Sequence, residues 1–347
     1  MKILITGGAG FIGSALVRYI IEHQQDDVFN VDKLSYAVHP YALASVTANP
    51  RYQFKKLDIC EADKLRLVFE QFQPDAVIHL AAETHVDCSI NSSEVFMRSN
   101  YMGTFNVLEV ARNYWQGLGA DKREQFRLVH ISTDEVYGDL PLPEDAPNAS
   151  EMRFTEKSLL VPSSPYAASK ASSDHLVKSW HRTYGLPVII SRCTNNYGPF
   201  QFSEKLIPHM VRSALNEQPL TIYGSGLQMR DWLYVDDHVR ALYLLLKSGK
   251  VGEIYNIGAG NEQRNIDMVH RICHLMDEIV PRAGDKSYAD LIEHISDRPG
   301  HDLRYAVDTT KIKSTIDWAP EQDFEQGLAR TVAWFVRDFD AADKYQA

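Results

Sequence analysis

The first half of the chain alternates short apolar runs with segments that have helical periodicity. The opening residues 1–6 form a continuous apolar, β-prone run, which is typical of a strand buried on both faces of a parallel sheet. Because helical segments separate these runs, the pattern predicts an α/β fold with a doubly wound parallel sheet and right-handed crossovers. Further strand-like runs lie at residues 28–31, 53–57, 76–80, 128–132 and 187–192.

The regular alternation loosens after Asn195. Prolines and glycines become frequent there, including Pro199, Gly224 and the pair Pro299-Gly300. Such segments predict a smaller, mixed C-terminal lobe over the carboxyl ends of the strands, where ligands bind in open α/β sheets. We expect a dinucleotide-binding domain from residues 1–190 and roughly 232–262, and a substrate-binding lobe from residues 191–231 and 263–347.

A glycine-rich turn follows the first apolar run directly. Gly7, Gly10 and Gly13 permit a tight turn, close approach of a pyrophosphate and close packing of the helix predicted at residues 14–23. The helix N-terminus then presents unpaired amides to the phosphates. Asp32 ends the next strand, about 20 residues downstream, where a carboxylate binds ribose hydroxyls and repels a 2′-phosphate. This combination predicts a Rossmann-type domain that binds NAD rather than NADP.

Tyr166 and Lys170 are four residues apart, so a helix places both on one face. Ser164 and Pro165 come just before them and supply a side-chain cap and a proline suited to the first helical position. A neighbouring ammonium and the positive nicotinamide ring would lower the tyrosine pKa from about 10 toward working pH. We therefore expect Tyr166 to accept a hydroxyl proton as hydride leaves the same carbon, and Lys170 to bond the nicotinamide ribose.

Two acids, Asp134 and Glu135, follow Thr133 at the end of a predicted strand. An enzyme that only moved a hydride would need the Thr, Tyr and Lys but not these two carboxyls. They indicate a second reaction with its own proton donor and acceptor, because neighbouring carboxyls with separated pKa values can divide acid and base roles. The alternative interpretation is a solvated acidic turn after a strand.

Composition narrows the class further. The 347 residues, 44% of them hydrophobic, can bury a large core and a smaller lobe. The net charge of −10 argues against nucleic acid or an anionic membrane as the main partner, so an anionic substrate needs a local basic pocket. Four widely spaced cysteines favour neither a metal site nor a disulfide framework, and no spanning or signal segment is evident. We expect a cytoplasmic protein with reduced thiols at Cys60, Cys88, Cys193 and Cys273.

These motifs together resemble the extended short-chain dehydrogenase/reductase family and, within it, the nucleotide-sugar 4,6-dehydratases. The resemblance runs from residue 1 to about residue 335. Beyond the glycine turn and the Thr133, Tyr166 and Lys170 set, it is carried by residues 32–36, 79–87, 132–139, 163–174, 195–199, 204–208, 230–237 and 297–302.

The resemblance implies dehydration of dTDP-glucose to dTDP-4-keto-6-deoxyglucose, with NAD as the cofactor. Tyr166 would remove the C4 hydroxyl proton, with Thr133 bonded to the same oxygen, as NAD takes the C4 hydride. Glu135 would then act as the base at C5, and a protonated Asp134 would donate to the departing C6 hydroxyl. Return of the hydride to C6 and of a proton to C5 would complete the reaction.

The family's binding residues carry over onto two sets of positions. Four residues in the second set, Lys205, Arg230, Arg298 and His301, are expected as cations, and guanidinium forks suit phosphate oxygens. No metal ligands are expected. The NAD site is expected at Gly7, Gly10, Phe11, Ile12, Gly13, Asp32, Lys33, Asp58, Ile59, Ala81, Ser99, Tyr166, Lys170 and Asn196. The nucleotide-sugar site is expected at Thr84, Thr133, Asn195, Lys205, Leu206, Tyr223, Arg230, Asn265, Arg298 and His301.

Two segments depart from the family pattern. Val38-His39-Pro40 stands where most members have Gly-Asn, and Cys88 stands where Arg is usual. The first borders the adenosine and is expected to change the loop there. The second removes a cation near the active site and is expected to affect a neighbouring acid or the retention of NAD. Neither touches the proposed acid, base or hydride relay.

Three alternative functions remain open from the sequence. A nucleotide-sugar 4-epimerase shares the glycine turn and the Tyr/Lys pair but does not need Asp134 and Glu135. A 4,6-dehydratase of another nucleotide sugar would keep both acids, and a dinucleotide-binding regulator would not need the relay.

The family also implies a homodimer in which helices of two subunits form a four-helix bundle. The candidate helices lie at residues 94–114 and 169–184, whose apolar positions could equally cover the chain's own sheet.

Overall fold

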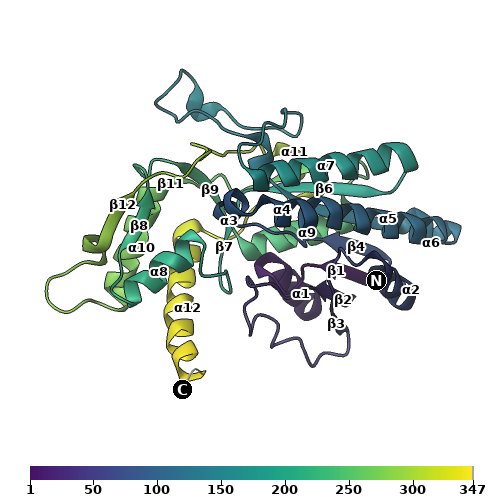
Figure 1. Cartoon of the computed structure of the whole chain (residues 1–347), viewed down its shortest axis with the longest axis horizontal. Coiled ribbons are helices and arrows are strands. Elements are labelled where there is room, and N and C mark those ends of the chain that lie inside the picture. Colours follow the sequence, from purple (N-terminus) through teal and green to yellow (C-terminus); the bar gives the residue numbers. More distant parts are fainter. Residues whose placement is uncertain (346–347) are drawn as a thin grey trace.

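The computed structural model describes residues 1–345, with side chains described through residue 339. Its centre is a seven-stranded parallel sheet in the order β10-β6-β5-β4-β1-β2-β3 (Figure 1). The order reverses direction between β1 and β4, as in doubly wound folds, and this confirms the predicted architecture. The strands are β1 (Lys2–Thr6), β2 (Asp27–Asp32), β3 (Tyr52–Lys56), β4 (Ala76–His79), β5 (Arg127–Thr133), β6 (Val188–Cys193) and β10 (Ile254–Ile257).

Helices cover both faces of this sheet, because its central strands are apolar on both sides. In β1, Ile3 and Ile5 pack into one apolar cluster and Leu4 packs into the cluster on the opposite face. The first face is covered by α1 (Phe11–His23), α9 (Val235–Ser248) and α11 (Thr310–Ile316). The second face is covered by α2 (Ala62–Phe72), α5 (Gly103–Gln116) and α7 (Pro165–Tyr184), and the short α6 (Ala120–Gln125) leads from α5 to β5.

A smaller lobe lies beside the carboxyl ends of the large sheet (Figure 1). Its apolar core includes Trp232, Met276 and Leu328. The mixed strand pairing agrees with the predicted mixed lobe. The boundaries between the two predicted domains stay a prediction, and residues 346–347 of the second domain lie outside the described part. β9 (Met229–Tyr234) pairs parallel with β7 (Asn195–Tyr197) and antiparallel with β11 (Glu262–Arg264), and β8 (Leu220–Tyr223) pairs parallel with β12 (Ile292–Ile295). The helices are α8 (Leu206–Leu215), α10 (Asn265–Ile279) and α12 (Phe324–Tyr345).

Residues 94–114 are helical throughout, as expected, but the type of helix changes along them. α3 (Val86–Asn91) and α4 (Ser93–Phe96) come first, and a π-helical turn at Met97–Met102 separates α4 from α5. Within this turn the Asn100 carbonyl accepts hydrogen bonds from the hydroxyls of Thr104 at 2.5 Å and Ser173 at 2.7 Å. The sequence did not predict the π-helical turn, because these tertiary contacts leave no trace in apolar periodicity.

The predicted N-terminus is correct for α7 but not for α1. In α7 the Ser164 hydroxyl accepts from the Ala167 amide at 3.1 Å and Pro165 is the first helical residue, as predicted. α1 begins at Phe11 rather than Ser14, because Gly10 already serves as its cap. Among residues 1–345, no helix combines the length and the apolar character that crossing a bilayer requires.

Candidate active site

A cleft lies where the carboxyl ends of β1, β2, β4, β5 and β6 face the smaller lobe. It contains about 1620 Å³ of space, including its open mouth. The reversal point of the sheet order is the usual ligand position in such folds. The cleft is lined by every residue predicted for the NAD site and by Thr84, Thr133, Asp134, Glu135, Asn195 and Lys205.

The three glycines of the first turn have different steric surroundings. Gly7 has φ +75°, and a Cβ there would lie 2.5 Å from the Ala81 nitrogen. A Cβ on Gly13 would lie 2.1 Å from the Gly7 oxygen, so α1 could not pack this closely on β1. Gly10 has no such neighbour within 3.4 Å and borders the cleft, where a side chain would occupy the space predicted for the pyrophosphate. The turn therefore fits a dinucleotide.

Asp32 ends β2 and is fixed by backbone amides. Its carboxylate accepts from Ala9 at 3.0 Å and from Leu34 at 2.8 Å. Burial raises the pKa of this carboxyl, and the two amides oppose the shift. Next to it, the Lys33 ammonium donates to Glu83 at 2.5 Å and to Ser99 at 3.0 Å. These bonds connect the end of β2 to two other segments on the side of the cleft predicted to bind the cofactor.

Asp134 and Glu135 follow β5 in a 3₁₀ turn and lie inside the cleft, not in bulk solvent. Asp134 is 1% exposed, and its Oδ1 accepts from the Thr133 hydroxyl at 3.3 Å. Burial and then the Glu135 charge raise the pKa of Asp134 well above its ordinary value. Burial also raises the pKa of Glu135, but Lys205, Arg230 and Arg298 oppose the shift. The surroundings therefore favour the protonated form of Asp134 more strongly than that of Glu135.

Tyr166 lies beside the acid pair and is 6% exposed. Burial, followed by the Glu135 charge, raises the pKa of its phenol in the chain by itself. The lowering expected beside the positive nicotinamide ring stays a prediction. The ammonium of Lys170 donates to the Ile131 carbonyl at 2.7 Å. Burial lowers the Lys170 pKa to about 8, with Asp174 acting in the opposite direction.

The predicted nucleotide-sugar residues divide into two groups. Thr84, Thr133, Asn195 and Lys205 line the cleft, and the Lys205 ammonium donates to the Thr84 carbonyl at 3.1 Å. The second group belongs to the smaller lobe and does not line this cleft. The two groups of predicted residues therefore do not share one cavity. The second group comprises Leu206, Tyr223, Arg230, Asn265, Arg298 and His301.

The cations predicted for the nucleotide sugar do not all carry a charge. Arg230 is 5% exposed, and its guanidinium donates to the carbonyls of Met229, Asp302 and Leu303. Burial, and next the charge of Arg298, lower the pKa of His301 to about 4. His301 is therefore neutral near pH 7, and its assignment as a cation was wrong. Lys205, Arg230 and Arg298 still surround Glu135 electrostatically, which supplies the local basic pocket.

The two departures from the family pattern occupy different surroundings. Val38 lines the cleft, whereas the ring of the adjacent His39 packs on Phe200 and Trp334 and its Nε2 lies 3.2 Å from Asp338. The loop is therefore anchored to α12. Cys88 is half-buried and does not line the cleft.

The cleft includes residues that the motif reading did not select. Glu204 directly precedes Lys205, and His85 lies in the segment 79–87, so the sequence did contain a signal for these two. Tyr36 likewise lies in the segment 32–36. Others come from irregular segments or from strand ends with no distinctive pattern, including Cys193, Gln201 and Phe202.

Comparison with known proteins bears on the identity of this cleft. The family model described as GDP-mannose 4,6 dehydratase matches residues 4–331. A dTDP-glucose 4,6-dehydratase of Salmonella typhimurium is 56% identical over 337 residues, which cover 97% of this chain and 93% of the relative. The dTDP-glucose 4,6-dehydratase 1 of Escherichia coli is 55% identical over 348 residues, covering 100% and 96%.

Solved structures agree with these relatives. A dTDP-glucose 4,6-dehydratase of Streptomyces venezuelae, crystallised with NAD and a second ligand, is 41% identical, covers 98% of each chain and has a TM-score of 0.86. A UDP-glucose 4-epimerase of Thermotoga maritima also shares the fold, with a TM-score of 0.82 over 98% of this chain and 100% of that chain, but is only 28% identical. The chain belongs to the dTDP-glucose 4,6-dehydratase family.

Proposed function

We propose that this chain converts dTDP-glucose to dTDP-4-keto-6-deoxyglucose. The observation that carries the proposal is the presence of two carboxyls, the buried Asp134 and the half-buried Glu135, in one cleft with Thr133, Tyr166 and Lys170. Oxidation alone does not require the acids, whereas removal of water across C5 and C6 requires a proton acceptor and a proton donor.

In the first step Tyr166 accepts the proton of the C4 hydroxyl, and Thr133 hydrogen-bonds the same oxygen. NAD, when bound, supplies the hydride acceptor for C4 and later the hydride donor for C6. The glycine turn and Asp32 hold the dinucleotide, and Lys170 bonds the nicotinamide ribose. The roles of the remaining cofactor residues are proposed on the same basis, since all of them line the cleft.

In the second step the C4 carbonyl makes the C5 hydrogen acidic. Glu135 takes this proton, and Asp134 gives its own proton to the C6 hydroxyl, which leaves as water. The different charge environments of the two carboxyls support this division, because Lys205, Arg230 and Arg298 all lower the pKa of Glu135, whereas the charges of Glu135 and Asp231 raise that of Asp134 more than Arg230 lowers it. The final protonation restores hydrogen at C5. Thr84 and Asn195 face the sugar, while Lys205, Arg230, Asn265 and Arg298 serve the diphosphate and nucleoside.

The deciding experiment is product analysis in deuterated water. Dehydration incorporates one solvent deuterium at C5 and produces a methyl group at C6. An epimerase leaves the C6 alcohol intact and incorporates no deuterium at C5, and that product would refute the proposal. A panel of nucleotide-glucose substrates, run in parallel, tests the preference for thymidine over uridine and other bases.

The pH profile provides a separate prediction. Activity rises as Glu135 ionises, and it falls when Lys170 loses its proton, because the lysine is charged only below its pKa of about 8. We therefore expect a bell-shaped kcat/KM profile whose alkaline limb lies near pH 8. Lys170→Arg keeps the charge at all these pH values, so the residual activity should lose this limb. A limb that persists unchanged in Lys170→Arg would assign it to another group, such as Asp134.

We also propose a cytoplasmic homodimer. The cytoplasmic location is supported by four unpaired cysteine thiols. The dimer is supported by large apolar side chains exposed along α4 and the π-helical turn, where Val95, Met97, Tyr101 and Met102 are each at least 37% exposed. Sedimentation equilibrium of the full chain tests the assembly.

A further inference from the structure

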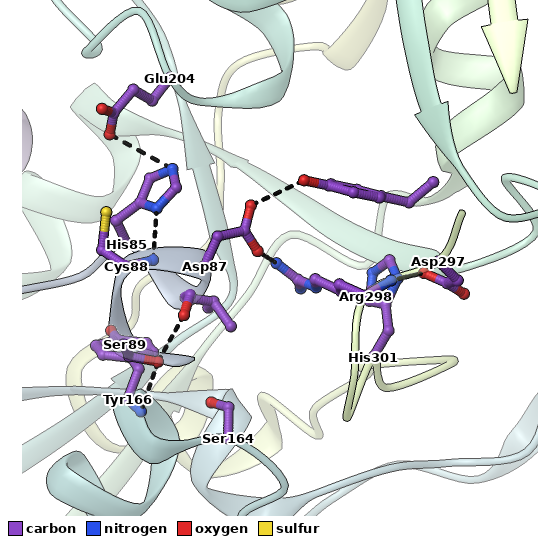
Figure 2. Close-up of polar contacts among 12 residues, drawn as sticks. His85, Asp87, Cys88, Ser89, Ser164, Tyr166, Glu204, Asp297, Arg298 and His301 are labelled. Atoms are coloured by element: carbon purple, nitrogen blue, oxygen red, sulfur yellow. Dashed lines mark hydrogen bonds and ion pairs between the residues drawn. The ribbon is translucent and has the colours of Figure 1, made fainter. Parts of the chain in front are cut away.

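The short helix α3 is in contact with three separate parts of the active site (Figure 2). His85 caps its start, with Nδ1 accepting from the Cys88 amide at 3.2 Å. The opposite ring nitrogen lies 3.4 Å from the Glu204 carboxylate, so a neutral ring with its proton on Nε2 satisfies both partners. Burial lowers the pKa of His85, which favours this neutral form.

Asp87 directs its carboxylate toward the smaller lobe. One oxygen lies 3.2 Å from Nη1 of Arg298 (Figure 2). The other accepts from the Tyr223 hydroxyl at 3.0 Å. Both partners belong to the residues predicted for the nucleotide-sugar site, and Arg298 is among those proposed for the diphosphate and nucleoside. In the described part of the chain, Nε of Arg298 is buried without a hydrogen-bond partner, so Asp87 is the contact that fixes this guanidinium.

Ser89 faces the catalytic helix. It is fully buried, donates to the Val86 carbonyl at 2.6 Å and accepts from the Tyr166 amide at 3.2 Å. The first amides of a helix have no partner within the helix. Ser164, the N-cap residue of α7, accepts a hydrogen bond from the Ala167 amide. The Tyr166 amide instead donates to Ser89, which belongs to a different helix, α3.

Helical geometry explains why one short element reaches both lobes. Asp87 and Ser89 are two residues apart, which on an α-helix turns their side chains by about 200° to nearly opposite sides. One side therefore holds diphosphate-binding groups and the other holds the backbone of the residue that accepts the C4 proton.

We propose that Asp87 and Ser89 are positioning residues that couple nucleotide binding to the placement of Tyr166. Asp87 sets Arg298 and Tyr223 for the diphosphate, and Ser89 fixes the start of α7. A displacement of Asp87 moves α3 and thereby Tyr166. This coupling rests on the proposed function, because it assigns the diphosphate to Arg298 and proton transfer to Tyr166.

The test uses the NAD-loaded full chain. For Asp87→Asn, we expect the Kd of thymidine diphosphate, measured by calorimetry, to rise about 10-fold, because the charge-assisted bond to Arg298 is lost. At saturating dTDP-glucose, the same variant also forms NADH more slowly in a single turnover. Ser89→Ala slows this step with little change in Kd, and in that background Asp87→Asn adds no further slowing.

Matched variants separate positioning from general effects. Asp121→Asn removes an exposed charge on α6 and should match the wild type in every measurement. If Asp87→Asn does not fold, Asp87→Glu replaces it: its longer carboxylate cannot keep both partners in place, and we expect the Kd to rise about 3-fold.

Two results would overturn the proposal. One is an unchanged Kd for thymidine diphosphate in the folded Asp87 variant. The other is that Asp87→Asn slows NADH formation by the same factor in the wild type and in the Ser89→Ala variant. Wild-type protein that binds thymidine diphosphate but leaves dTDP-glucose unchanged would instead contradict the proposed function, and the calorimetric comparison would still decide the role of Asp87.

Discussion

C4 oxidation slows by about 10²–10⁴-fold in the Tyr166→Phe variant, the range expected when a positioned proton acceptor is removed. Phe keeps the ring that packs against Phe96, so the buried surroundings are preserved and the loss is confined to the hydroxyl. Rapid mixing with dTDP-glucose, followed by NADH absorbance, measures the step directly. The substrate's KM should change little, because the phenol acts mainly in the transition state.

Tyr184→Phe is the matched control for this variant. Tyr184 stands on the same helix α7 but is 42% exposed and far from the cleft lining. It should show wild-type NADH formation. Normal NADH formation in Tyr166→Phe would remove the tyrosine from the relay and require another acceptor in the cleft.

The Glu135→Gln variant behaves differently: the first step proceeds, and the reaction then stops at the ketone. The amide has nearly the same shape as the carboxyl but cannot take the C5 proton, so elimination should slow by more than about 10²-fold. Because the hydride cannot be returned to C6 before elimination, NADH accumulates toward the concentration of active sites. Absorbance reports this accumulation, and nuclear magnetic resonance of the sugar reports the missing methyl group.

Glu151→Gln, an exposed position, controls for the loss of one carboxylate. The two main variants also control each other, since Tyr166→Phe should give neither NADH nor product and Glu135→Gln should give NADH without product. Loss of product in Glu135→Gln without any reduced cofactor would place Glu135 before hydride transfer and contradict its assignment to C5.

The features that could be predicted from sequence depend on local physics. The Gly7 turn requires a positive φ, and the Ser164-Pro165 pair satisfies helix-start geometry within a few residues. The apolar runs predicted the strands because burial on both faces of a parallel sheet demands them. These signals also located Asp134 and Glu135, since both directly follow a strand.

The features that were missed depend on contacts between distant segments. The π-helical turn at Met97–Met102 is accompanied by a hydrogen bond from Ser173, and the neutral state of His301 results from burial in the smaller lobe. Burial of the phenol beside Glu135, which raises the pKa of Tyr166 in the chain without a cofactor, also could not be predicted from the sequence. The role of Asp87 depends on Arg298, 211 residues away in the chain.

The position of β10 beside β6 limits how this molecule can be dissected. The polypeptide leaves the large sheet after Cys193, builds part of the smaller lobe, and then returns to supply α9 and β10. A fragment that stops at residue 193 would lack the side chains of Leu242 and Leu245, which cover one face of the sheet, and would leave β6 with an open edge. The nucleotide-binding half therefore cannot be excised by a single cut, and gene truncation at that point should yield aggregates rather than an independent module.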